Sequence, residues 1–220
     1  MKRNKFLSLL GLSFIGTFFF SAKKREALLT KTKCDDPITP PVPEGPYYKN
    51  ERLNRIDIAE AKKGAPVDYV FKVEDKNCKP IKDAIVDIWQ CDAAGHYSDF
   101  DREKTLGETW LRGYQKTNEK GECTFTSIFP GWYTNRITHL HAKVHINETT
   151  VLTTNCFFPK EIENEIYKST LYPKGPNPLS VAEDAELRVD KNTTRHDTLV
   201  MYVTRDARDR IIASYTFAIE

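Results

Sequence analysis

Two histidines stand two residues apart in the segment FPGWYTNRITHLHAKVHI, and this spacing is the sharpest chemical signal in the sequence. On an extended strand, His139 and His141 project from the same face while Leu140 points to the other. Two imidazoles on one face can bind one metal ion. A Pro-Gly turn just upstream delivers Trp132 and Tyr133 to the same end of the strand. The segment therefore brings two imidazoles and a phenol toward one place.

A simpler interpretation of the histidine pair is a solvent-facing strand, on which alternate residues are polar by default. Lys143 and His145 continue the same face and fit that interpretation. A second tyrosine-bearing segment, DIWQCDAAGHYSDF, favours the metal, because a predicted strand ends there in a turn that presents His96 and Tyr97. Taken alone, Tyr97 is more often a packed aromatic residue than a metal ligand.

Short strands are the elements that must hold these residues. Apolar and polar residues alternate from Val67 to Val73, which is typical of a half-buried strand. Similar strands are predicted at residues 84–90, 123–128, 139–146, 151–157, 198–204 and 211–219, and one short helix at 159–169. Polar turn signals join them. The pattern predicts an all-β fold, an antiparallel β-sandwich with long loops and at most one or two short helices.

The first 22 residues predict an export signal, because a positive start, MKRNK, precedes an apolar run of signal-peptide length. An uncleaved membrane anchor is the alternative, although the run is slightly short for a spanning helix of roughly 20 residues. Residues 23–45 are charged and then rich in proline, which predicts an extended linker. Residues 46–220 then form the β-sandwich domain. The expected location is the periplasm, the cell envelope or the exterior, with a membrane tether if the anchor is retained.

Charge and cysteine content narrow the choice of function. The 33 Lys and Arg residues nearly balance the 31 Asp and Glu residues, and no basic stripe is visible, so nucleic-acid binding is not expected. Export allows disulfides, but an odd number of cysteines leaves at least one thiol over. The pairing stays open among the five cysteines Cys34, Cys78, Cys91, Cys123 and Cys156.

The chain resembles the intradiol ring-cleavage dioxygenases, the catechol and protocatechuate dioxygenase family, and most closely their exported single-domain branch. The resemblance covers nearly the whole domain, from EGPYY through DIWQCDAAGHYSDF and the histidine segment to IIASYTFAI. Its most specific part is PGWY followed by an arginine and HLH, all at the family's spacing. The family is typified by an iron(III) site, so the resemblance implies Fe(3+) as the cofactor and no organic cofactor.

The resemblance implies a role for each matching residue. Tyr97, Tyr133, His139 and His141 match the four iron ligands, with Tyr133 and His141 axial and the other two equatorial beside a solvent hydroxide. Two phenolates stabilise ferric iron by charge, and ligand type and geometry select the metal. Arg136 matches the arginine that flanks the substrate, so Tyr133 and Arg136 are the expected catalytic residues.

Two further positions bear on the pocket. The EGPYY segment lines the pocket mouth in the family, which makes Tyr48 an expected substrate contact. As free-standing aromatics, Tyr47 and Tyr48 are equally well explained as packing residues. Gln90 stands where exported relatives commonly have histidine, and this departure predicts a change in pocket polarity.

The function implied is cleavage of a catechol-type ring by molecular oxygen to a cis,cis-muconate-type dicarboxylate. Its partners are the catechol and oxygen; the identity of the catechol and the oligomeric state stay open. One alternative is a non-catalytic exported β-sandwich that binds a ligand or a protein. Another is a zinc hydrolase that uses His139, His141 and a carboxylate, but no carboxylate stands at a suggestive spacing.

Overall fold

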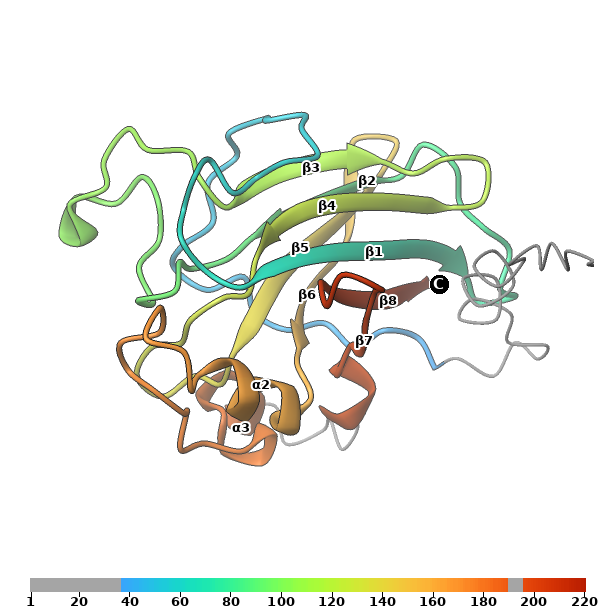
Figure 1. Cartoon of the computed structure of the whole chain (residues 1–220). Coiled ribbons are helices and arrows are strands. Elements are labelled where there is room, and N and C mark those ends of the chain that lie inside the picture. Colours follow the sequence, from blue (N-terminus) through green and yellow to red (C-terminus); the bar gives the residue numbers. More distant parts are fainter. Residues whose placement is uncertain (1–36, 190–195) are drawn as a thin grey trace, which may run out of the picture. The chain divides into compact units, whose positions relative to one another are not determined.

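Two four-stranded sheets make up the fold that the computed structural model describes for residues 37–189 and 196–220 (Figure 1). Their strand orders are β4-β1-β8-β7 and β3-β2-β5-β6. The strands are β1 (Pro66–Asp75), β2 (Ile85–Trp89), β3 (Arg112–Lys116), β4 (Glu122–Ile128), β5 (His139–Ile146), β6 (Thr149–Phe157), β7 (Tyr202–Arg205) and β8 (Ile211–Ile219). The predicted antiparallel sandwich is confirmed, except that β1 and β8 pair in parallel.

The core lies between the two sheets and follows from alternation along the strands. From the first sheet it takes the apolar residues of β1, and from the second it takes Leu140, Ala142 and Val144 of β5. All three of these β5 residues are fully buried. Because side chains alternate along a strand, His139 and His141 must then lie on the face of this sheet turned away from the core.

Helical segments are few and short within the described residues. The predicted helix at 159–169 is present as α2 (Lys160–Ile166), and a second helix, α3 (Ala185–Val189), was not predicted. Three 3-10 turns complete the set, at η1 (Asp101–Glu103), η2 (Val181–Glu183) and η3 (His196–Leu199). Ser180 and Glu183 form a reciprocal capping box on η2, which satisfies backbone donors at its start.

Two strands differ from the prediction. β3 was not predicted, since its sequence, RGYQK, is almost wholly polar and shows no apolar alternation. β7 begins at Tyr202 instead of residue 198 because the chain first turns through η3. That turn buries Leu199 in a small cluster with Val42, Ile137 and Phe157.

The predicted export signal and most of the predicted linker lie outside the described residues. The described end of the linker range, residues 37–45, packs on the sheets: Thr39 and Val42 are buried, and their backbone N–H groups donate to carbonyls of Ala218 and Thr153. The boundary at residue 45 therefore stays a prediction. Among the described residues, no helix is both long and apolar enough to cross a bilayer.

The cysteines divide into two kinds. Cys78 is disulfide-bonded. Cys91, Cys123 and Cys156 are free thiols, and all three are buried. Cys34 lies outside the described residues, so its pairing stays open.

The Gln90 side chain points into the core between the two sheets. The change in polarity expected from Gln90 therefore lies in the core and not in the pocket. Its carbonyl oxygen accepts a hydrogen bond from the Tyr69 hydroxyl at 2.7 Å, and its amide nitrogen donates to the Ile128 carbonyl at 2.8 Å. Both Gln90 and Tyr69 are fully buried. The amide thus satisfies two polar groups that water cannot reach.

We expect Gln90→Leu to destabilise the fold, because it leaves the Tyr69 hydroxyl and the Ile128 carbonyl without their partner. A buried polar group left unsatisfied costs about 1–3 kcal/mol. Urea unfolding gives the loss, and adding Tyr69→Phe should recover part of it by removing the stranded hydroxyl. A Gln90→Leu protein as stable as the wild type would show that this amide does not support the core.

Candidate metal centre

Four side chains converge on one point at the end of β5. The Nε2 atoms of His139 and His141 lie 3.0 Å apart. The Tyr133 hydroxyl lies 3.1 Å from Nε2 of His139, and the Tyr97 hydroxyl lies 3.1 Å from Nε2 of His141. The structure therefore brings together all four residues that the sequence proposes as ligands, from one strand and two separate loops.

Two glycines let the tyrosine-bearing loops approach each other. A Cβ on Gly131 would lie 2.6 Å from the backbone oxygen of Asp92, and the Gly131 N–H donates to that oxygen. Gly95 has a φ of +87°, and a Cβ there would lie 2.3 Å from the Trp132 carbonyl oxygen. Real Cβ atoms do not come this close to backbone atoms, so any side chain at either position would push the loops apart. The backbones, more than the side chains, set the distance between the two phenols.

The second nitrogen of each imidazole is also engaged. Nδ1 of His139 lies 2.6 Å from the Ile137 carbonyl oxygen, to which it donates, so Nε2 keeps its lone pair for the shared point. Nδ1 of His141 accepts a hydrogen bond from the amide nitrogen of Asn155 at 2.9 Å, because the oxygen of that amide accepts from Arg136. Such outer partners fix ring orientation at metal sites.

His141 is the middle of a row that crosses the sheet. Arg112, Trp89, His141 and Asn155 are direct neighbours on β3, β2, β5 and the following strand β6. Direct neighbours share a face. The Trp89 ring stacks on the His141 ring, with centroids 4.8 Å apart and planes 6° apart. The sequence did not identify Arg112 or Asn155, because their importance depends on strand register.

Burial decides the charge of the four candidate metal ligands, Tyr97, Tyr133, His139 and His141, which we call the four donors. Desolvation raises the pKa of Tyr97 and of Tyr133 and lowers the pKa of His139 and of His141. The groups are thus two phenols and two neutral imidazoles. Neutral imidazoles offer lone pairs, and phenols become hard anionic oxygens when a cation replaces their protons. This donor set fits a trivalent ion such as ferric iron.

Arg136 lies beside the four donors and is anchored from behind. Its Nε donates to both carboxylate oxygens of Asp184, at 2.9 and 3.0 Å. One terminal nitrogen donates to the Asn155 oxygen at 2.5 Å, and the other lies 3.5 Å from the Tyr133 hydroxyl. Asp184 is fully buried. No local sequence pattern indicates Asp184, since it lies 48 residues from Arg136.

The EGPYY segment reaches this site, but through Tyr47 more than through Tyr48. Tyr48 packs on Trp89 and donates its hydroxyl to Asp87 at 3.1 Å. The Tyr47 ring instead stacks on Tyr97, with centroids 4.0 Å apart. The role of Tyr48 as a substrate contact therefore stays a prediction.

Other histidines are set apart from the four donors. His145 is on the same face of β5, but it bonds to Thr150 at the far end of the strand. His96 is exposed on the loop before Tyr97. Within residues 37–189 and 196–220, no group of three or more His, Cys, Asp or Glu side chains is placed to hold a metal. The groups that accompany His139 and His141 are phenols.

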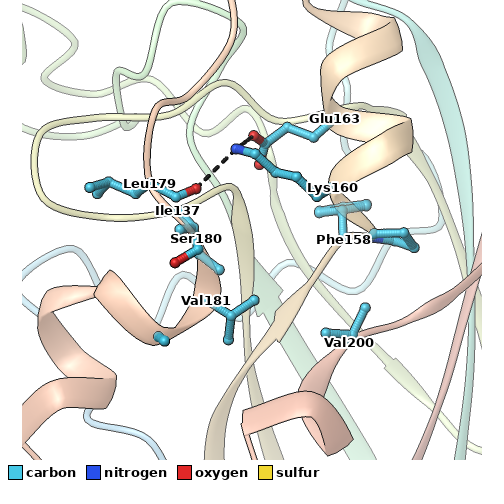
Figure 2. A pocket seen from close by; sticks show the side chains of 10 residues that line it. Ile137, Phe158, Lys160, Glu163, Leu179, Ser180, Val181 and Val200 are labelled. Carbon is cyan, nitrogen blue, oxygen red and sulfur yellow. Dashed lines mark hydrogen bonds and ion pairs between the residues drawn. The ribbon is translucent and has the colours of Figure 1, made fainter.

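A separate cavity of about 360 Å³ lies between the start of α2 and the segment 179–182, and Ile137, next to Arg136, also lines it (Figure 2). Its wall is largely apolar, with Ile137, Phe158, Val181 and Val200 among the side chains that line it. At its edge the Lys160 ammonium bonds to the Glu163 carboxylate. None of the four donor residues lines it.

Comparisons with known proteins place this geometry in context. The sequence profile of the family described as Dioxygenase matches residues 43–174. Comparison with curated protein sequences gives no match.

Solved structures resemble the chain over most of its length. An intradiol ring-cleavage dioxygenase from Tetranychus urticae is 29% identical, with a TM-score of 0.75 over 84% of this chain and 94% of its own. The dioxygenase domain of a dioxygenase carbohydrate-binding protein fusion from Streptomyces sp. SirexAA-E is 27% identical, with a TM-score of 0.60, over 84% and 99%. Hydroxyquinol 1,2-dioxygenase from Pseudomonas putida DLL-E4 is 18% identical, with a TM-score of 0.63 over 84% and 68%, a likeness of fold alone.

Asp87, which accepts the hydrogen bond of Tyr48, should make the stability of the fold depend on pH. Burial raises the pKa of its carboxyl from 3.8 to about 6, so the folded state favours the protonated form. Its contribution to stability is therefore largest below pH 4 and falls as the pH rises from about 4 to 6. Asp87→Asn should remove this loss, which is at most about 3 kcal/mol.

Urea unfolding of wild type and Asp87→Asn at pH 4, 5 and 6.5 checks the sign. The free energy of unfolding of the variant should rise relative to that of the wild type as the pH rises. Asp101→Asn, at an exposed position, should show no such trend. A gap between wild type and Asp87→Asn that stays constant with pH would show that Asp87 is an ordinary carboxylate.

Proposed function

This chain belongs to the intradiol ring-cleavage dioxygenase family, and from that premise we propose that it uses ferric iron and molecular oxygen to cleave a catechol-type ring. Cleavage falls between the two hydroxyl-bearing carbons and yields a cis,cis-muconate-type dicarboxylic acid. The observation that carries the proposal is the convergence of Tyr133, His139, His141 and Tyr97, which contact one another in that order at 3.0–3.1 Å. No organic cofactor is needed for this reaction.

In this proposal those four side chains hold the iron. When bound, ferric iron would supply Lewis-acid chemistry that activates the substrate ring toward oxygen. The protein supplies orientation and exclusion of water: both histidines and Tyr97 are buried, and Trp89 covers the His141 ring. Charges in so dry a site act more strongly than in water.

Tyr133 and Arg136 move and stabilise charge. Tyr133, as a phenolate, accepts a proton from one substrate hydroxyl at its Oη atom. Arg136 presents a terminal nitrogen 3.5 Å from that oxygen, so the same guanidinium can stabilise negative charge that develops on the substrate. Asp184 and Asn155 keep the guanidinium in place while this happens.

We also propose that the protein is exported to the periplasm, the cell envelope or the exterior, with or without a tether through its first 22 residues. The signal-like start of the sequence supports this. The disulfide at Cys78 agrees with an oxidising compartment. A non-catalytic exported binding module has no use for two buried phenols set against two imidazoles.

The purified full chain, loaded with iron, should be red to burgundy from phenolate-to-iron(III) charge transfer. It should consume oxygen with catechol, methylcatechols, hydroxyquinol or protocatechuate and form a ring-opened dicarboxylate. Tyr97→Phe and Tyr133→Phe should each weaken and shift the visible band, because each removes one phenolate. Absorption, metal analysis and oxygen uptake give the three readouts.

Histidine variants supply the control for this experiment. His141→Ala should lose iron or activity, whereas His145→Ala, on the same face of β5 but bonded to Thr150, should keep both. A colourless protein that holds zinc stoichiometrically and no iron would contradict the proposal. Dependence on His145 with independence from His141 would show that the ligand register is wrong.

Removing the Arg136 charge should slow turnover on the order of a hundredfold while iron and its colour are kept. Arg136→Ala alone would leave the Asp184 carboxylate buried without its cation, which costs about 3–5 kcal/mol. The informative variant is therefore Arg136→Met combined with Asp184→Asn, compared with Asp184→Asn alone. Turnover should fall more than substrate binding weakens, because the charge that Arg136 meets grows during the reaction.

Single-turnover kinetics of the iron-loaded variants with catechol under excess oxygen measure this effect. A normal rate of ring cleavage in the double variant would make Arg136 a purely structural residue beside β5.

A further inference from the structure

Tyr47 lies between the buried donors and the surface. Its ring stacks on Tyr97 at 4.0 Å with planes 15° apart, and it meets the Tyr133 ring edge-on at 5.7 Å. Tyr97 is fully buried, whereas Tyr47 is only partly buried. Tyr47 thus covers the Tyr97 ring and borders the Tyr133 ring, and it forms a wall beside both phenols on the side nearer to solvent.

Besides its ring contacts with Tyr97, Tyr133 and Phe100, three contacts hold Tyr47, and two of them come from η1. The Tyr47 hydroxyl donates to Oε1 of Glu103 at 3.3 Å. The Arg102 guanidinium lies 4.3 Å from the ring centroid, on the face that Tyr97 leaves free. The backbone carbonyl of Tyr47 accepts from Arg112 at 2.9 Å. The ring is therefore held at its backbone, its hydroxyl and its outer face.

The loop that carries Arg102 and Glu103 is itself anchored to the site. The Thr105 hydroxyl donates to the Tyr97 carbonyl at 2.6 Å, and Asp99 donates its N–H to the Thr105 carbonyl. Lys49, two residues beyond Tyr47, pairs with Asp99 at 3.0 Å. These bonds tie the loop to both the Tyr97 segment and the Tyr47 segment. The placement of η1 on Tyr47 is thus built into the fold.

The charges of η1 are arranged to act on Tyr47. Arg102 and Glu103 also lie within 3.6 Å of each other, so they form one ion pair laid over the ring and its hydroxyl. The Arg102 side chain is 54% exposed, and η1 has no buried residue of its own. The pair therefore adds little to the core, and Arg102 packs on the Tyr47 ring and, at a longer distance, on the Phe100 ring.

We propose that Arg102 and Glu103 are positioning residues that clamp the Tyr47 ring against Tyr97 and thereby limit the size of ring substituents that the site admits. The limit on substituents rests on the proposed ring-cleavage function, whereas the clamp does not. A fixed wall rejects a bulky substituent because moving it aside breaks the cation–π contact and the hydrogen bond. Without these two contacts, the Tyr47 ring can move aside and make room for such a substituent.

The first test measures the clamp without any metal or substrate. The full chain, labelled with ¹³C-tyrosine, is compared with Arg102→Met and Glu103→Ala by ring-flip relaxation, with the Tyr47 signal assigned from Tyr47→Phe. Ring flips of Tyr47 should become faster in both variants and return toward the wild-type rate in Arg102→Lys, which keeps the cation. Lys104→Met and Glu108→Ala, exposed changes on the same loop, should leave the flips unchanged.

The second test measures selection with the iron-loaded proteins. In Arg102→Met and Glu103→Ala, KM for a catechol with a bulky ring substituent should fall about threefold or more relative to KM for catechol, a size expected for loss of one exposed cation–π contact. The kcat for catechol should stay within about twofold, because neither residue touches the four donors. A residue that only stabilised the loop would not separate the two substrates.

The outcomes distinguish the two layers of the inference. Unchanged Tyr47 ring flips in both variants would overturn the clamp. Faster flips with an unchanged KM ratio would overturn the limit on substituents. If the wild type turned over none of catechol, methylcatechols, hydroxyquinol and protocatechuate, the proposed function would fail, and the ring flips alone would still decide the clamp.

Discussion

One face of strand β5 packs in the core and the other carries His139 and His141. The site therefore depends on the strict alternation of side chains along this strand. Leu140, Ala142 and Val144 fill the core, so the residues between them are committed to the other face. A slip of one residue would send both imidazoles into the core and the apolar residues outward. Because that slip would disrupt the whole core, the register of β5 is strongly specified. This register holds the two imidazoles beside the two phenols.

Two buried arginines, Arg136 and Arg112, organise the electrostatics of the site. Arg136 is buried and neutralised by Asp184, which also accepts the backbone N–H of Ile137 at 2.8 Å. One carboxylate thus positions the guanidinium and the chain segment that leads into β5. Arg112, equally buried, bonds to Ser98 beside Tyr97 and to the Tyr47 carbonyl. Arg136 and Arg112 therefore link separate loops through hydrogen bonds, and their charges also contribute positive electrostatic potential to the site.

The sequence could predict what depends on local spacing and little that depends on register or docking. His139 and His141 needed only the two-residue period of a strand, and the sandwich needed only alternation. Whether Tyr47 or Tyr48 faces the phenols depends on how an extended segment lies on the sheet, which neighbouring residues do not encode. Asp184 pairs with Arg136 across a long stretch of chain, and β3 offers no apolar pattern, so neither could be found from local sequence.

The parallel pairing of β1 with β8 has a consequence for how the molecule is made. β1 lies in the interior of its sheet, and its partner on one side runs from Ile211, opposite Val67, to Ile219, opposite Asp75. Most of the domain separates these two strands in the sequence. Pairings between such distant segments slow folding, because the entropy of closing the loop is lost before the contact forms. During synthesis β1 emerges early, with a row of unsatisfied backbone groups along one side. This sheet, which packs across the core from the sheet that carries His139 and His141, is completed only when Ile211–Ile219 has left the ribosome.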